Sequence, residues 1–271
     1  MIVEAADFRF DAYQAGKYGD HCIIHGDCRL VLPKIPDKAI GMIMTDPPYG
    51  HNNNNNGDLI ANREKVFGGG QNVGKARPID NDGIEAENLF DFLVSETPRL
   101  LERGGCCCCC CCGGGPDPMF ARWALKLDHL LDFKQMVVWD KGPMGMGHHY
   151  RRSYETVLVA MKRGGACKWY DNSKRIENII RPGDYGISKI IPQADDHPTV
   201  KPVELFQHFI RLHSQPLEII LDPFMGSGTG LVACKNLGRR GIGIETSMEH
   251  CLHAEQRLAQ EVLDLPVGVS R

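Results

Sequence analysis

The chain has 271 residues, of which 42% are hydrophobic and 24% are charged, a balance ordinary for a folded α/β protein with a sizeable core. Its formal net charge of −3 excludes attachment to nucleic acid through general basicity, so any such contact requires a local basic patch. No apolar run approaches the roughly eighteen residues of a membrane span, and residues 1–9 lack a secretory signal pattern, so we expect a cytoplasmic protein.

Short apolar runs alternate with longer amphipathic stretches, which is the pattern of a mostly parallel sheet with helices on both faces. Strands are expected at 22–24, 40–44, 106–112, 135–139, 156–161, 219–221 and 240–244. Helices are expected at 86–101, 118–131, 202–213, 229–237 and 248–263. Leu89, Leu93 and Leu100 recur at helical spacing in the first of these helices, so we expect it to have one core-facing side.

A short motif, Asp46-Pro47-Pro48-Tyr49, follows the expected strand 40–44. The exocyclic amine of adenine or cytosine is a poor nucleophile, because its lone pair is delocalised into the ring. The carboxylate of Asp46 and the carbonyl of Pro47, held rigid by proline φ angles, are suited to accept the two N–H bonds and favour a tetrahedral nitrogen. The ring of Tyr49 offers a face on which a base can stack after leaving the duplex. The motif therefore indicates methyl transfer to a flat, amino-bearing ring.

Residues 51–83 have no regular pattern and include the run Asn52 to Asn56, so we expect a long mobile loop. Two interpretations of the run remain open: a flexible linker, or polar side chains that contact a substrate next to Asp46.

Seven of the twelve cysteines are consecutive, at 106–112. Consecutive residues of a strand alternate faces, so the seven cannot converge on one tetrahedral zinc ion. We expect instead a strand buried on both faces and filled by small apolar side chains. The other cysteines show no C-x-x-C spacing, and the pair His148-His149 has no third ligand in the sequence, so no metal site is predicted.

A basic cluster occupies residues 141–181, where nine Lys and Arg against three Asp and Glu give a local charge of +6. Each of these charges alone is typical of solvated surface, but their clustering favours contact with DNA phosphates. The candidate DNA-binding residues are Arg151, Arg152, Lys168, Lys174 and Arg175.

A glycine-rich turn follows the expected strand 219–221, in the segment Asp222-Pro-Phe-Met-Gly-Ser-Gly-Thr229. Gly226 and Gly228 allow the backbone to approach a ligand closely, but the G-x-G-x-x-G spacing of dinucleotide sites is absent. Glu245 ends the next expected strand, about twenty residues later, where an acid can bind a ribose diol. These features suit any adenosine-bearing cofactor.

In their order, these motifs resemble the amino-group DNA methyltransferases of the permuted beta class. In that class the D-P-P-Y segment comes first, a target-recognition region follows, and the F-x-G-x-G segment comes last; here these are 46–49, 163–196 and 224–228. The resemblance covers residues from about 20 to 260. It implies a Rossmann-like, mostly parallel seven-stranded methyltransferase sheet with a circularly permuted motif order. Its parts would be a catalytic half at 20–162, an inserted target-recognition region at 163–196 and an S-adenosylmethionine-binding half at 197–263.

The resemblance also implies roles for further segments. Gly26-Asp27-Cys28 resembles the segment whose acid meets the adenine of the cofactor, and His197-Pro-Thr-Val-Lys-Pro202 resembles a segment at its methionine end. Asp222 would face the amino-acid end of the cofactor and Phe224 its adenosine. The implied cofactor-binding residues are Asp27, Cys28, Thr199, Lys201, Asp222, Phe224, Gly226, Gly228, Thr229 and Glu245.

The activity implied by the resemblance is site-specific transfer of a methyl group from S-adenosylmethionine to N6 of a flipped adenine in double-stranded DNA. The catalytic residues would be Asp46, Pro47, Pro48 and Tyr49, in a monomer or a homodimer without metal. Aspartate in the first position is commoner among adenine enzymes of the family, and serine among cytosine-N4 enzymes, so adenine is favoured and cytosine-N4 is the nearest alternative. An RNA or protein methyltransferase, a non-catalytic nucleic-acid-binding module and, more distantly, a nicotinamide oxidoreductase also remain open.

Overall fold

A computed structural model describes residues 1–49, 85–111, 119–142, 153–187 and 201–260, and the account below concerns these residues. The expected loop at 51–83 and the pair His148-His149 lie outside them. None of the described helices is long and apolar enough to cross a membrane.

The described strands form one sheet, in the order β1-β2-β9-β8-β3-β4-β6-β5-β7. The strands are β1 (Ile2–Glu4), β2 (His21–His25), β3 (Ile40–Thr45), β4 (Leu101–Cys111), β5 (Asp132–Asp140), β6 (Tyr154–Met161), β7 (Ile179–Ile180), β8 (Ile219–Asp222) and β9 (Arg240–Glu245). Neighbouring strands are parallel except where β6 pairs with β4 and β5. The mostly parallel α/β sheet is confirmed, and it carries β1 and β7 as short edge strands beyond the seven expected.

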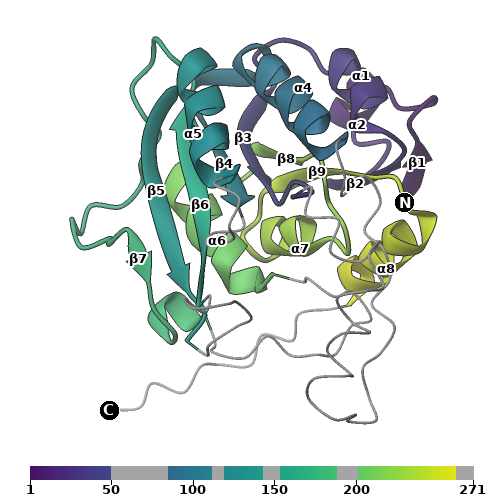
Figure 1. The fold of residues 1–271 in the computed structure, drawn as a ribbon. Coiled ribbons are helices and arrows are strands. Elements are labelled where there is room, and N and C mark those ends of the chain that lie inside the picture. The colour runs from purple at the N-terminus through teal and green to yellow at the C-terminus, as the bar shows by residue number, and fades with distance from the viewer. Residues whose placement is uncertain (50–84, 112–118, 143–152, 188–200, 261–271) are drawn as a thin grey trace, which may run out of the picture.

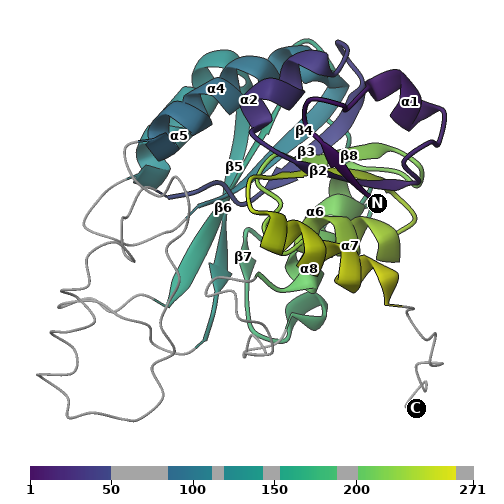
Figure 2. The ribbon, with the colours of Figure 1, turned by 90° about the vertical axis from the view of Figure 1, so that its right-hand side faces the viewer.

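Helices cover both faces of the sheet (Figure 1 and Figure 2). On one face lie α1 (Phe10–Gln14), α2 (Cys28–Val31), α4 (Glu85–Leu100) and α5 (Met119–Leu130). On the other lie α6 (Val203–His213), α7 (Thr229–Asn236) and α8 (Met248–Ala259). The 3-10 turns η1 (Leu32–Lys34) and η2 (Asp184–Gly186) complete the described elements. Leu89, Leu93 and Leu100 are buried, so α4 presents its leucines to the core as expected.

The cysteine tract forms the central strand β4, and Cys106 to Cys110 are at most 1% exposed. Cys107 and Cys109 join the apolar core beneath α4 and α5, whereas Cys106, Cys108 and Cys110 join the core beneath α6. The expectation of a strand buried on both faces is therefore confirmed for the part of the tract that the structure describes.

Four strands position the candidate site. Strands β2, β9, β8 and β3 are adjacent and parallel, so their carboxyl ends meet at one edge of the sheet. The chain leaves β8 toward β9 and leaves β3 toward β4, in opposite directions along the sheet. Open α/β sheets bind ligands beyond the carboxyl ends of the strands at such a switch point, so this edge is the candidate site.

Candidate active site

Asp46 lies one residue beyond the end of β3, and its carboxylate is held by two side chains. The ammonium of Lys201 donates to Asp46 Oδ2 at 2.6 Å, and the hydroxyl of Tyr49 donates to Asp46 Oδ1. The same ammonium donates to the Tyr49 hydroxyl at 3.0 Å and lies 5.3 Å from the centroid of its ring. The structure therefore brings together Asp46, Tyr49 and Lys201, which was expected at the cofactor and here lies among the predicted catalytic residues.

A second carboxylate, Glu155 near the start of β6, adjoins this group. Its Oε2 lies 3.4 Å from the Lys201 ammonium, and its Oε1 accepts a hydrogen bond of 2.8 Å from Lys141. Two carboxylates and two ammonium groups therefore form one network. Because Lys201 is only 6% exposed, this network is the main electrostatic feature of the site.

Burial and mutual attraction act against each other in this network. Burial raises the pKa of Asp46 above its ordinary value, although the Lys201 ammonium opposes the shift. Burial alone would lower the pKa of Lys201, but the carboxylates of Asp46 and Glu155 raise it. Lys201 is therefore a permanent cation, and Asp46 is a carboxyl group that accepts a proton more readily than an exposed aspartate.

Aromatic rings from α4 and α5 line the apolar side of the site. The ring of Tyr49 lies 6.4 Å from that of Trp123 between centroids, and Trp123 stacks on Phe90 at 3.8 Å. Trp123 and Phe90 are fully buried, so Tyr49 rests against a fixed aromatic wall. Pro47, also buried, and Pro48 hold the chain between Asp46 and this wall.

On the neighbouring strand β8, Asp222 is buried at the same edge of the sheet. Its Oδ1 accepts 2.7 Å and 3.3 Å hydrogen bonds from the Thr45 hydroxyl and the Phe224 amide. Burial raises the pKa of Asp222 to about 7, with the charge of Asp46 adding to the shift. A cationic group bound here would favour the ionised form, as the amino-acid end of a cofactor requires.

Glu245 closes β9 and is held by backbone amides. Gly226 N donates to its Oε2 at 2.9 Å and Ser247 N donates to its Oε1 at 2.8 Å. Burial favours a raised pKa for Glu245, but hydrogen bonds from His250 and these amides keep the pKa below its ordinary value. The Thr246 hydroxyl also donates to Oε1, in a long bond of 3.4 Å. Because an ionised carboxylate has about four acceptor positions, the hydroxyls of a ribose would have to replace the weaker of these contacts.

The turn between Asp222 and α7 has the backbone that its glycines predict. Gly226 and Gly228 have φ angles of 53° and 84°, and a Cβ on Gly228 would lie 2.6 Å from the Cβ of Ala254. Thr229 then begins α7 and accepts a hydrogen bond from Arg257 at 3.2 Å. The turn therefore lies between Asp222 and Glu245, at the edge of the sheet where the sequence predicts the cofactor.

The expected adenine contact, Asp27, follows β2 at the same edge. Its carboxylate caps α2 by accepting from Arg29 N at 2.8 Å, and it pairs with the Arg29 guanidinium at 2.6 Å. Cys28 is buried, and burial raises its pKa to about 12. Phe224 is partly buried and packs against the core beside this edge. Thr199 lies outside the described residues.

Of the predicted DNA-binding residues, the structure describes Lys168, Lys174 and Arg175. Lys168 is only 16% exposed, and its ammonium is bound by Glu102 and Glu218. These two acids stand at the amino ends of β4 and β8, so Lys168 lies at the opposite edge of the sheet from Asp46. An internal ion pair explains this lysine better than a phosphate contact.

The remaining basic candidates are less constrained. Lys174 and Arg175 are exposed, in the coil that returns from the end of β6 to β7. The part of this segment that the structure describes has little regular structure beyond β7 and η2. Arg151 and Arg152 lie outside them.

Sequence reasoning missed Glu155 and Trp123. Glu155 is an acid inside an otherwise apolar strand, and this local irregularity was the available signal for a partner of Lys201. Trp123 occupies a core-facing position of α5 and carries no signal that distinguishes it from an ordinary core residue.

Comparisons with known proteins agree on the family and the fold. The DNA methylase family matches residues 40–256. The DNA adenine methyltransferase YhdJ of Escherichia coli is 27% identical to this chain over 87% of it and 82% of the relative. The type II methyltransferase M.HinfI of Haemophilus influenzae is 28% identical over 88% of this chain and 68% of the relative.

Solved structures share the fold. The M1.HpyAVI–SAM complex is 24% identical and has a TM-score of 0.62, with 89% of this chain and all of that chain covered. The cytosine-N4-specific PvuII DNA methyltransferase is 17% identical and has a TM-score of 0.63, with 89% of this chain and 87% of that chain covered.

Proposed function

The chain belongs to the DNA methylase family, and we propose that it transfers a methyl group from S-adenosylmethionine to the N6 amine of adenine in double-stranded DNA. The proposal includes the permuted beta-class order, flipping of the target base, and the target-recognition region at 163–196.

The observation that supports the proposal most strongly is a direct contact between the two parts of the candidate site, the segment Thr45–Asp46 and the segment that begins at Asp222. Thr45, the residue before Asp46, donates its hydroxyl hydrogen bond to Asp222 on the adjacent strand at 2.7 Å. The acid suited to the amino-acid end of the cofactor therefore adjoins the acid suited to the target amine. A methyl donor and its acceptor can thus be held next to each other. Holding two reactants together raises the rate of their reaction, because the bimolecular step becomes effectively unimolecular.

In this proposal Asp46 and the Pro47 carbonyl accept the two N–H bonds of the adenine amine and draw the nitrogen lone pair out of the ring. S-adenosylmethionine, when bound, supplies a methyl group on a positively charged sulfur. The target nitrogen would accept this methyl group and then release one proton. The raised pKa of Asp46 suits its carboxylate to hold that proton briefly.

The proposal includes one rearrangement. Asp46 Oδ1 accepts a hydrogen bond from the Tyr49 hydroxyl, and we expect the incoming amine to take the place of that hydroxyl. Lys201 can remain on Oδ2 and keep the carboxylate oriented. The Tyr49 ring, released from Asp46, is then available to stack on the base.

Adenine is preferred over cytosine for two reasons. The catalytic motif begins with aspartate at Asp46, and YhdJ, a relative over most of the chain, is named as a DNA adenine methyltransferase. To test the preference, purified protein is incubated with unmethylated duplex DNA and S-adenosylmethionine that carries an isotope-labelled methyl group. The DNA is then digested to nucleosides for mass spectrometry.

We expect labelled N6-methyladenine. Labelled N4-methylcytosine would refute the adenine assignment. Parallel incubations use RNA and protein in place of DNA, and label that appears only in these would refute DNA as the substrate. Absence of label in every arm, with the protein folded and bound to DNA, would leave the non-catalytic binding module as the better account.

A further inference from the structure

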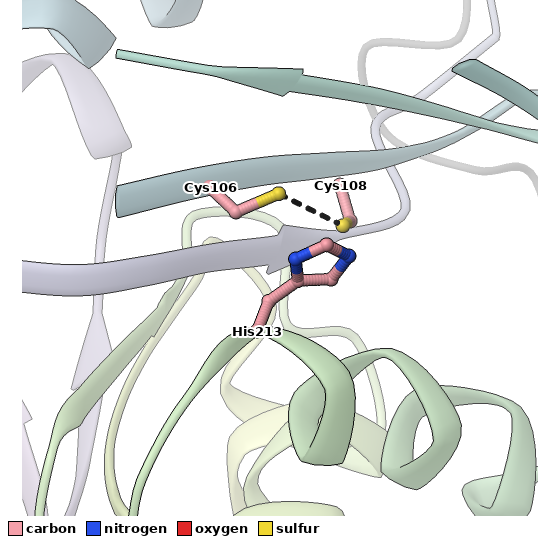
Figure 3. A group of neighbouring side chains, drawn as sticks. All are labelled: Cys106, Cys108 and His213. Atoms are coloured by element: carbon pink, nitrogen blue, oxygen red, sulfur yellow. Dashed lines mark hydrogen bonds between the residues drawn. The ribbon is translucent and has the colours of Figure 1, made fainter. Parts of the chain in front are cut away.

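Three side chains gather on the α6 face of the sheet, away from the candidate active site. Cys106 and Cys108 project from β4, and His213 is the last residue of α6. One potential ligand atom from each lies within 4.8 Å of the others. Figure 3 shows the imidazole ring of His213 opposite the two sulfur atoms. All three residues are at most 3% exposed.

The spacing of the sulfur atoms fits a bound ion. The Sγ atoms of Cys106 and Cys108 are 3.6 Å apart. Two sulfur ligands at about 2.3 Å from a tetrahedral zinc ion stand about 3.8 Å from each other. Sulfur atoms in a disulfide would instead be about 2.0 Å apart. The pair is therefore already close to the separation that a shared metal ion imposes.

The third side chain is oriented by the backbone. Nδ1 of His213 lies 3.0 Å from the carbonyl oxygen of Lys168. A carbonyl only accepts, so Nδ1 carries a proton, and in the neutral form of the ring the lone pair is on Nε2. Histidine ligands of metals are commonly fixed by such a bond. The ring of Trp169 packs edge-on against His213 at 5.3 Å and restricts it further.

We propose that Cys106, Cys108 and His213 form a buried binding site for a thiophilic metal ion, with zinc as its occupant. Soft thiolate ligands select zinc or monovalent copper. Two thiolates and a neutral imidazole carry a charge of −2, which a divalent ion balances and a monovalent ion does not. Charge balance therefore favours zinc over monovalent copper, because an unbalanced charge in the core is costly. Three protein ligands leave one coordination position for a small exogenous ligand.

The strand geometry that argued against zinc in the whole tract creates this smaller site. Alternation of faces separates neighbouring cysteines, but it places every second cysteine on the same side. The third ligand comes from α6 and is remote in the sequence, so no local spacing signals it. An ion here would tie the last turn of α6 to β4 and stabilise the fold, without any role in methyl transfer.

The chain contains a matched control for the proposal. Cys107 and Cys109 lie on the same strand with the same spacing, and their Sγ atoms are 3.5 Å apart. They face the core beneath α4 and α5, on the side of β4 opposite His213. Cys106→Ala with Cys108→Ala is therefore compared with Cys107→Ala with Cys109→Ala, and each change removes two buried thiols.

The first experiment measures metal content by inductively coupled plasma mass spectrometry. The full-length protein is purified for it under reducing conditions and without chelator. Chelator-stripped protein is then titrated with zinc alone and, in a separate arm, with monovalent copper, each against a competing chelator dye. We expect one equivalent of zinc in the wild type and in the Cys107/Cys109 variant. In the Cys106/Cys108 variant we expect zinc affinity to fall at least tenfold. His213→Gln should lower zinc affinity at least tenfold.

Several results would overturn the proposal. Wild-type protein that is folded by circular dichroism but takes up no ion would do so, as would equal loss in the two double variants. Stoichiometric copper with no zinc would contradict the zinc assignment, and thiol counting that finds a Cys106–Cys108 disulfide would replace the metal site altogether. If the Cys106/Cys108 variant does not fold, cobalt in the stripped wild type and in His213→Gln still decides. A sulfur-to-cobalt charge-transfer band is expected, and it should weaken or shift in the variant.

Discussion

The two halves of the candidate site, one around Asp46 and the other around Asp222 and Glu245, hold their carboxylates by different means. Asp46 and Glu155 are held by lysine side chains, and the central contact joins Asp46 to Lys201 from the other half of the chain. Glu245 and Asp222 are held largely by backbone amides and a neighbouring hydroxyl. We call the first arrangement the buried charge network. The second, in which the amides of Phe224, Gly226 and Ser247 bind the two acids, is called the backbone cradle.

Because of this difference, we expect substitutions in the two halves to affect stability and activity differently. Removing one partner from a buried charge network leaves an uncompensated charge, so the Asp46 half should be sensitive in stability as well as activity. The cradle depends on backbone conformation, so the cofactor half should be sensitive at its glycines. Each prediction below tests one side of this contrast.

The largest effect is expected for Asp46→Asn. The amide cannot accept as a carboxylate does, so we expect methyl transfer to fall by roughly 1,000-fold, the scale of a lost transition-state hydrogen bond. Binding of S-adenosylmethionine, measured by calorimetry, should change less than about threefold, a free-energy change below about 0.7 kcal/mol. Asp11→Asn, at an exposed carboxylate, is the control and should leave both quantities unchanged. Equal loss of cofactor binding in Asp46→Asn would mean that the two half-sites are not separable.

Lys201→Met should reveal the charge network in stability. We expect the free energy of unfolding to fall by about 3–5 kcal/mol, because Asp46 and Glu155 lose their shared buried cation. Adding Asp46→Asn to this variant should recover part of the loss. Lys134→Met, which removes an exposed partner of Asp132, should cost no more than about 1 kcal/mol in the same denaturant titration. Similar losses for the two lysines would contradict a buried network.

Gly228→Ala tests the backbone cradle. A residue with a Cβ at a φ of 84° is strained by about 1–2 kcal/mol, and contact with Ala254 at 2.6 Å adds an overpacking cost of about 1–3 kcal/mol. Gly238→Ala is the matched control, since its φ is 66° but a Cβ there has nothing within 4 Å. Thermal unfolding and cofactor titration of the two variants should show the larger loss, and the only loss of affinity, at Gly228. Equal effects would show that strain alone matters.

The smallest expected effect is a pH dependence of cofactor binding. Because the pKa of Asp222 is raised to about 7, the folded protein holds a proton on it where an unfolded chain does not, and stability from this group falls as pH rises from about 4 toward 7. A bound ammonium group requires the ionised form, so cofactor affinity should rise about tenfold between roughly pH 6 and 8. Asp222→Asn should flatten this dependence in calorimetry. An unchanged slope in the variant would assign the titration to another group.

The fold was largely predictable from the sequence because its elements have local signals. Buried strands such as Ile40–Thr45 are continuous apolar runs, and the helix Glu85–Leu100 repeats leucine at helical spacing. The short elements were missed for the same reason: Ile2–Glu4 and Ile179–Ile180 have too few residues to show a period.

The candidate site was predictable in part. The residues of its proposed cofactor half could be predicted together because Asp222, Gly226 and Gly228 lie within one turn, and Glu245 ends the following strand. The catalytic half depends on pairs that are remote in sequence, such as Lys201 with Asp46 and Glu155. Lys168 shows the converse, since its charge counted toward a basic patch although Glu102 and Glu218 neutralise it. Net local charge does not reveal which charges are already paired.

The most direct test of the central claim is sequencing of methylated positions in DNA from cells that lack other DNA methylases and express either this protein or Asp46→Asn. The account predicts N6-methyladenine at one fixed sequence with the wild type, and unmodified DNA with a variant that is folded and equally abundant. Methylation of cytosine at that sequence, or the same adenine methylation with both proteins, would contradict it.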